Sequence, residues 1–169
     1  ISEQSFTGAT NLGQLTSGAS EINANANAYT ITVADATVDA ANLGTLLTQT
    51  TGSITVNSGT VFGTNAQIIA ANTSNQISSF AAKNLTVDEG TLTTDEANTL
   101  AGITTGVVTA TLTTGAIASF ANLGETNNAF STLVNDGSLD ASALNALNAK
   151  SSGGVINVSA TTITGNATD

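Results

Sequence analysis

The sequence predicts a solenoid built from repeats, rich in β-structure and carrying short helices, with about six coils whose strands stack in parallel. Three observations predict this fold. A nine-residue pattern recurs three times without gaps, each copy passes from helical to strand periodicity, and the chain has no proline to interrupt a strand ladder. A β-sandwich made from the threonine-rich strands is the alternative fold.

The repeat itself is the strongest of these observations. Its copies begin at Val38, Leu92 and Leu139 and align residue by residue. Each copy reaches a glycine 14 residues after its start, and these glycines are Gly52, Gly106 and Gly153. A stretch of strand-forming residues follows each glycine, at residues 53–56, 107–112 and 154–158.

Weaker similarities complete the set of units. The string Ile-x-Ser-Phe-Ala occurs at residues 77–81 and 117–121, and Asn-Leu-Gly occurs at residues 11–13, 42–44 and 122–124. Placing these strings in register gives unit starts near residues 7, 38, 65, 92, 118 and 139, within one repeat domain that covers residues 1–169. The steps between starts are 21–31 residues, a length typical of one coil in a repeat protein.

The first part of each unit has helical spacing. Leu43 and Leu46 are three positions apart, as are Leu144 and Leu147, so each pair lies on one face of a short helix. A helix of about two turns is not stable alone. We therefore expect neighbouring copies to bury these leucines against one another.

Capping residues predict where these helices begin and end. Asp39 and Asp140 precede the alanine-rich part of a unit, where a helix N-cap is expected. Thr93 and Glu96 have the spacing of a capping box. The three glycines that end the copies occupy the place of a C-terminal helix stop.

The second part of each unit alternates as a strand does. Apolar Val108, Ala110 and Leu112 alternate with three threonines, at positions 109, 111 and 113. The threonines are therefore expected on the outer face of a sheet. Each unit thus predicts a helix, a glycine turn and a strand.

Composition excludes several classes of function. The chain has 2 basic and 12 acidic residues, a net charge of −10, and neither His nor Cys. Binding to nucleic acid or to an anionic membrane needs many Lys and Arg side chains, and no apolar run is long enough for membrane insertion. The common metal ligands and nucleophile systems are missing. We therefore expect no enzymatic activity, no organic cofactor, no nucleic-acid partner and no membrane insertion.

Acidic residues recur at equivalent corners of the three strong copies. The six candidates are Asp35, Asp39, Asp88, Glu89, Asp136 and Asp140. Stacked carboxylates repel one another, and a hard cation such as Ca²⁺ would relieve that repulsion. In the alternative interpretation, Asp39 and Asp140 are helix caps and the other acids are solvated turn residues. Thr93 replaces the aspartate in the second copy, which weakens the case for a repeated calcium site.

Threonine pairs suggest a flat binding face. Thr-x-Thr strings occur at residues 30–32, 91–93, 109–113 and 162–164. Ranked threonines are one way in which solenoids bind ice, but the aligned series Thr32 and Thr86 continues with Leu133. An uncharged strand face is the simpler interpretation.

One segment carries a resemblance to a known family. Residues 96–110 read Glu-Ala-Asn-Thr-Leu-Ala-Gly-Ile-Thr-Thr-Gly-Val-Val-Thr-Ala. This segment resembles the (D/E)-A-x-x-L-x-x-(L/I)-T-T-G-x-V-x-A repeats of giant secreted and cell-surface proteins of marine bacteria, cyanobacteria included. The resemblance implies an extracellular, adhesive or scaffold-forming protein without enzymatic activity. Such giants often carry calcium-binding repeats, but the G-G-x-G-x-D nonapeptide is absent here, so that site is not carried over.

The expected function is that of an extracellular, cell-surface structural or adhesive repeat protein, in a filament, a surface layer or a long fibre. The alternatives are a calcium-dependent adhesin module, an ice- or surface-binding solenoid, and a phage fibre module. Residues 155–158 and 161–164 are as strand-prone as any internal copy, and no polar capping unit is evident. The expected partners are therefore the chain itself, head to tail, or flanking repeats of a longer chain. The chain begins at Ile1 without a signal-peptide pattern, as a processed or excised chain would.

Overall fold

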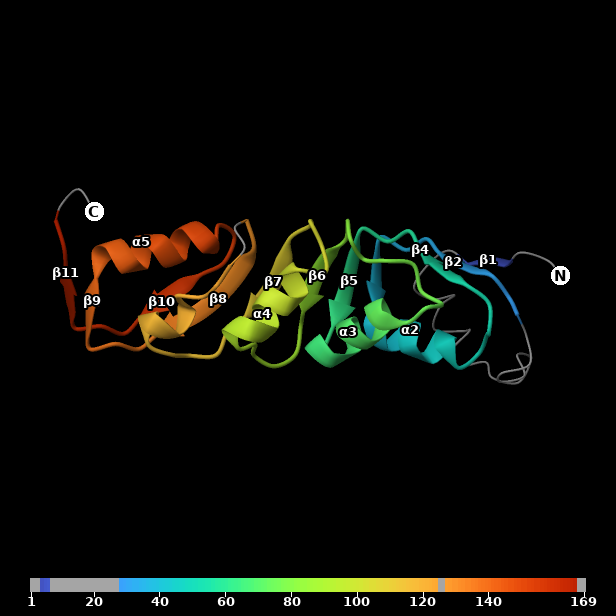
Figure 1. Cartoon of the computed structure of the whole chain (residues 1–169), viewed down its shortest axis with the longest axis horizontal. Coiled ribbons are helices and arrows are strands. Elements are labelled where there is room, and N and C mark those ends of the chain that lie inside the picture. Colours follow the sequence, from blue (N-terminus) through green and yellow to red (C-terminus); the bar gives the residue numbers. More distant parts are fainter. Residues whose placement is uncertain (1–3, 7–27, 125–126, 167–169) are drawn as a thin grey trace.

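The computed structural model describes residues 4–6, 28–124 and 127–166, with the backbone alone for residues 4–6. These residues form an elongated α/β structure in which successive strands follow one another along the long axis (Figure 1). The first described strand, β1 (Gln4–Phe6), and the last, β11 (Thr162–Thr164), lie at opposite ends of the molecule (Figure 1). The unit start near residue 7 and the Asn-Leu-Gly string at residues 11–13 lie outside the described residues.

The strands within the described residues form three sheets. The six-stranded sheet has the order β10-β8-β7-β6-β5-β3, with strands Ile156–Val158, Ala129–Val134, Val108–Thr111, Asn84–Val87, Thr60–Gly63 and Thr37–Asp39. A three-stranded sheet has the order β1-β2-β4, with strands Gln4–Phe6, Ile31–Val33 and Ile54–Val56. A two-stranded sheet joins β11 (Thr162–Thr164) to β9 (Ser138–Asp140).

Every strand pairing in the described part of the chain is parallel. The predicted parallel stacking is therefore confirmed, whereas the alternative sandwich would pair its strands antiparallel. In the six-stranded sheet, paired residues lie between 20 positions apart, as for Thr109 and Ala129, and 24 positions apart, as for Thr60 and Asn84. These separations are shorter than most of the 21–31 residues that the sequence alignment indicated, and the separation of 20 lies just below that range.

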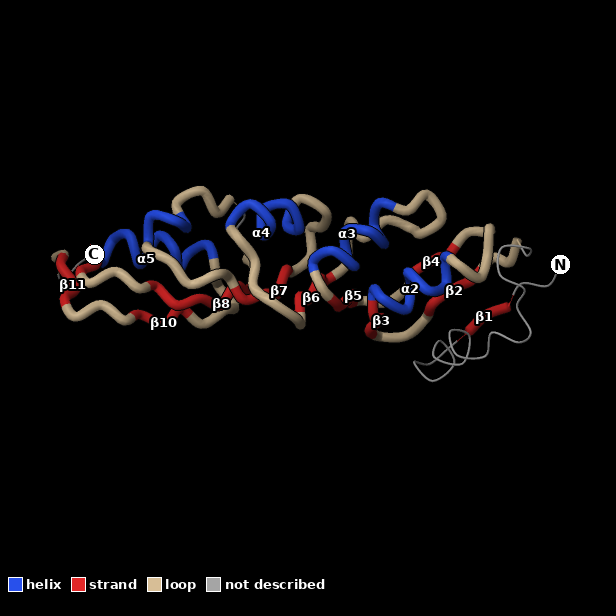
Figure 2. Tube along the Cα trace, turned by 90° about the horizontal axis from the view of Figure 1, so that it is seen from below, coloured by secondary structure: helices blue, strands red, loops and turns tan. Residues whose placement is uncertain are grey.

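Short helices lie between the strands along the chain. They are α2 (Ala40–Leu47), α3 (Asn65–Thr73), α4 (Thr94–Ala101), the 3-10 helix η1 (Ile117–Phe120) and α5 (Ala141–Lys150). Figure 2 shows α3, α4 and α5 on the side of the molecule away from the six-stranded sheet.

The predicted helix starts are confirmed. The Asp39 carboxylate accepts a hydrogen bond from the Ala41 N–H at 2.8 Å and caps α2. At α4, the Glu96 N–H donates to Thr93 Oγ1, and the Thr93 N–H donates to the Glu96 carboxylate at 2.8 Å, which completes the capping box. These bonds satisfy N–H groups that have no partner inside a helix.

The predicted helix stops at the glycines are wrong. Helices α2, α4 and α5 end at Leu47, Ala101 and Lys150, before Gly52, Gly106 and Gly153. A Cβ atom at Gly52 would overlap the backbone carbonyl of Tyr29, and one at Gly106 would overlap the carbonyl of Lys83. Both glycines are thus required by the close approach of a neighbouring strand, and not by a helix terminus.

A buried hydroxyl accompanies each of these glycines. Thr50 Oγ1 donates to the Tyr29 carbonyl at 2.8 Å, and Thr104 Oγ1 donates to the Lys83 carbonyl at 2.5 Å. Ser151 Oγ makes the equivalent bond to the Phe130 carbonyl, and in all three cases the acceptor lies 21 residues before the donor. The Thr-Thr-Gly string therefore joins one layer of the structure to the layer before it.

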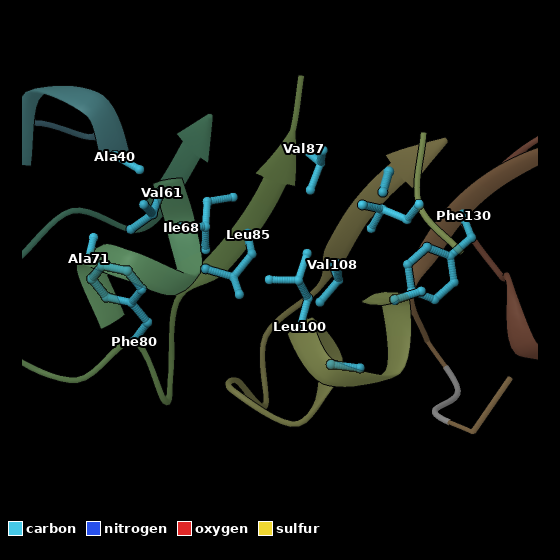
Figure 3. Packing of buried hydrophobic residues seen from close by; sticks show 14 of the residues in the cluster. Ala40, Val61, Ile68, Ala71, Phe80, Leu85, Val87, Leu100, Val108 and Phe130 are labelled. Carbon is cyan, nitrogen blue, oxygen red and sulfur yellow. The ribbon is translucent and has the colours of Figure 1, made fainter. Parts of the chain in front are cut away.

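The hydrophobic core runs between the sheets and the helices. Strand residues Val61, Leu85 and Val108 and helix residues Ile68 and Leu100 are completely buried and lie in one continuous row (Figure 3). In β7, Val108 and Ala110 face inward while the threonines at 109 and 111 are exposed, as the alternation predicted. Burying such aliphatic side chains contributes roughly 1.5–3 kcal/mol each.

Candidate functional site

Three of the six candidate acidic residues accept hydrogen bonds from backbone N–H groups. Asp39 and Asp140 cap α2 and α5, as the alternative interpretation predicted. Asp136 Oδ2 accepts the Ile117 N–H at 2.6 Å, across 19 residues of chain. Asp88 and Glu89 lie exposed in the turn after β6.

The charge state of Asp140 follows from its cap. The Ser142 hydroxyl, then the N–H groups of Ser142 and Ala143, donate to this carboxylate and lower its pKa. The N–H and hydroxyl of Thr93 lower the pKa of Glu96 in the same way. Both carboxylates are therefore stabilised as anions by helix capping.

In the described part of the chain, the acidic residues of the calcium hypothesis do not come together as a set of ligands. No three His, Cys, Asp or Glu side chains within residues 28–124 and 127–166 come together in a way that could hold a metal ion. Asp35 is half-buried in the turn before β3, and Asp88 and Glu89 face solvent. A calcium site at Asp35, Asp39, Asp88, Glu89, Asp136 and Asp140 stays a prediction.

The most distinctive surface is formed by β10 and β11, each of which pairs with a single strand among the described residues. β10 pairs with β8, and β11 pairs with β9. The Ser159 N–H donates to the Val134 carbonyl at 3.0 Å, and the Thr132 N–H donates to the Val155 carbonyl at 3.0 Å. Because backbone groups alternate along a strand, those of Ile156 point to the open side. We call β10 and β11 the open edge.

Apolar side chains at the open edge are uncovered where their neighbours are buried. Ile163 pairs with Leu139, yet Ile163 is 57% exposed and Leu139 is 2% exposed. Val155, just before β10, is 61% exposed. Residues 151–166 contain no charged residue and no proline, the usual protection of a sheet edge. The open edge is therefore a ready template for one more parallel strand.

Comparisons with protein families, with curated proteins and with solved structures found no match to this chain. None of the helices in the described part is long and apolar enough to cross a membrane.

Sequence reasoning located some of these features and missed others. The strand-prone stretch at residues 161–164 predicted the strand that forms part of the open edge. The bond between Asp136 and Ile117 and the buried hydroxyls were not predicted, because their partners lie about 20 residues away along the chain. The identical Thr-Thr-Gly strings were the available signal for the hydroxyls.

Proposed function

We propose that this chain is an extracellular structural repeat protein, a solenoid whose units stack end to end in a filament, a surface layer or a long fibre. The single observation that carries the proposal is the open edge, where Ile163 is uncovered at a position buried in the preceding layer. The parallel pairing with a nearly constant separation along the chain supports a solenoid architecture.

The partner proposed for the open edge is a second copy of the chain, bound through its opposite end. β1 lies at that end and pairs with β2 alone among the described strands (Figure 1). A contact between two different ends does not close into a dimer but continues from copy to copy. The same edge accepts a flanking repeat where the unit is part of a longer chain.

Electrostatics determines the conditions for this assembly. A net charge of −10 makes each copy repel the next in dilute buffer. Salt screens charges beyond about 8–10 Å at 0.1–0.15 M and about 3 Å at 1 M. The edge itself is uncharged, so its hydrophobic and hydrogen-bonding contacts are retained at high salt. Association is therefore expected to increase with salt, as in seawater.

Location and the absence of catalysis belong to the same proposal. They are supported by the resemblance of residues 96–110 to repeats of secreted giants, and by a composition with only 2 basic residues and no His or Cys. A surface rich in hydroxyl and amide groups suits a durable extracellular material.

Sedimentation velocity over a range of protein concentrations tests the assembly. The native chain is expected to form species larger than a monomer in high salt, and Ile163→Lys is expected to abolish them by placing a charge on the open edge. Val107→Lys is the matched control, since Val107 is also exposed, at 39%, but lies away from the open edge. A strict monomer at high concentration in high salt with calcium, or equal assembly of Ile163→Lys and native chain, would contradict the proposal.

A further inference from the structure

Three strands begin in the same way, and β10 at the open edge is one of them. Strands β4, β7 and β10 start at Ile54, Val108 and Ile156, each two residues after a glycine. A Cβ atom on any of these three glycines would overlap a backbone carbonyl of the layer before it. The glycines are Gly52, Gly106 and Gly154. The three strands therefore occupy equivalent places in the stack, and the contacts that β4 and β7 make with the next layer indicate what β10 would accept.

A carboxamide binds the first backbone N–H of β7. The Val108 N–H donates to Oδ1 of Asn128 at 2.9 Å, and the two residues are 0% and 3% exposed. Asn128 directly precedes β8, the next strand of the same sheet. A buried N–H without a partner would destabilise the junction. The side-chain amide of the following layer thus completes it.

A second carboxamide has the same role at β4. Gln76 Nε2 donates to the Thr50 carbonyl at 3.0 Å and to the Gly52 carbonyl at 3.2 Å. The backbone carbonyl of Gln76 accepts the Ile54 N–H at 2.6 Å. Gln76 directly precedes Ile77, which forms a parallel bridge to Ile54. At both junctions a carboxamide residue therefore lies just before the paired segment and satisfies backbone groups near the glycine.

Strand β10 presents the same backbone groups, and none of the described strands receives them. It pairs with β8 alone in the described part of the chain. That pairing uses the Val155 carbonyl, so the Gly154 carbonyl and the Ile156 N–H point to the open side by alternation. The matching partner is an uncharged side chain with both a donor and an acceptor. A carboxamide has both, whereas a carboxylate only accepts and an ammonium group only donates.

Strand β1 of a second copy offers such a residue. It begins with Gln4 and contains no charged residue. It pairs with β2 alone among the described strands and lies at the end of the molecule opposite β11 (Figure 1). Both β1 and β10 pair in parallel with their neighbours. A copy stacked along the long axis in the same orientation therefore brings its β1 parallel to β10.

We propose that Gln4 of one copy is the residue by which the open edge of another copy recognises its partner, as Asn128 and Gln76 are bound inside the chain. This inference rests on the end-to-end stacking proposed above and names the contact that directs it. A carboxamide buries no charge, so the contact persists at the high salt that screens the repulsion between copies.

Sedimentation velocity of full-length variants in high salt tests the contact. Gln4→Ala should weaken each end-to-end contact by about tenfold or more, because it leaves backbone groups of the neighbouring copy unpaired. Asn157→Ala is the matched control and should assemble as the native chain does. Asn157 is an exposed carboxamide residue of the open edge, but its backbone groups face β8.

A mixture of two variants tests which ends meet. Ile163→Lys retains Gln4 but has a charged open edge, whereas Gln4→Ala retains the native open edge. Each variant alone is expected to stay monomeric at a concentration where the native chain assembles. An equimolar mixture should form a species of two copies that grows no further, because only one of its contacts can form.

The possible failures are distinguishable. If the native chain stays monomeric, the proposed stacking is wrong and this contact is wrong with it. If the native chain assembles and Gln4→Ala assembles equally well, the stacking stands but another segment occupies the open edge. If Asn157→Ala loses assembly as Gln4→Ala does, or if the mixture stays monomeric, Gln4 is not the residue that the open edge recognises.

Discussion

At the scale of single residues, the glycine of the Thr-Thr-Gly string has a different role from the one that its position after a helix suggests. Gly106 lies against the carbonyl of Lys83, which also accepts the hydroxyl of Thr104. The Gly106 N–H in turn donates to Thr104 Oγ1 at 2.9 Å. Glycine and hydroxyl therefore act together to bring two segments of backbone into contact.

This arrangement predicts opposite effects for two nearby glycines. Gly106→Ala should destabilise the protein by about 1–3 kcal/mol, because the new methyl group forces two backbone segments apart. Gly102→Ala is the matched control, since a Cβ at Gly102 meets its nearest atoms at an ordinary 3.5 Å and the residue has a helical φ of −71°. It should be neutral or stabilising by up to about 1 kcal/mol. Urea unfolding of both variants measures the difference, and equal destabilisation would contradict this account.

At the scale of elements, the helices are too short to be stable alone and depend on their caps. Helix α5 begins at Asp140, whose carboxylate accepts the N–H groups of Ser142 at 2.9 Å and Ala143 at 3.4 Å. These bonds, with that from the Ser142 hydroxyl, lower the pKa of Asp140 below the usual 3.8.

The lowered pKa predicts a pH-dependent contribution. A carboxyl group whose pKa is lower in the folded state stabilises the fold above its unfolded pKa, and this contribution is lost as the pH falls through the folded pKa. Asp140→Ala should therefore lower the melting temperature at neutral pH, and the difference from the native chain should shrink below pH 3.8. Asp88→Ala, at an exposed turn, is the control. A difference that stays constant with pH would show that the anionic cap is not its cause.

At the scale of the whole molecule, the six-stranded sheet is continuous, whereas the shorter strand ladders beside it are replaced by one another along the chain. The ladder of β1, β2 and β4 continues as far as a bridge from Ile54 to Ile77. A second ladder then begins with the bridge between Leu92 and Leu112. The six-stranded sheet spans this change through β5, β6 and β7 and so connects the two parts.

The hydrogen bonds that the acidic side chains already accept predict how calcium affects the stability of the protein. The carboxylates of Asp39, Asp136 and Asp140 already accept backbone N–H groups. Calcium chloride should therefore raise the melting temperature no more than sodium chloride of equal ionic strength, and EDTA should leave it unchanged. Thermal unfolding monitored by circular dichroism measures this. A saturable stabilisation specific to calcium would instead favour the calcium-dependent adhesin, with Asp35, Asp88 and Glu89 as the first ligands to replace.

The sequence by itself determined the features that depend on neighbours within a few residues. Local spacing predicted the helix caps at Asp39, Asp140 and Thr93. It also predicted the alternation along residues 108–111 and the strands after each glycine. Parallel pairing also followed, because short helices and strands that recur in one order can bury their apolar sides only by stacking.

Only the tertiary structure decided the features that join segments about 20 residues apart. The approach of Gly106 to Lys83 and the bond from Ile117 to Asp136 depend on strand register. Ile163 is exposed because β11 pairs only with β9 among the described strands. Register is set by contacts between layers, and repeats of unequal length allow several alignments of similar quality. A local pattern therefore identifies the residues that pair, while the packing of the whole stack selects their partners.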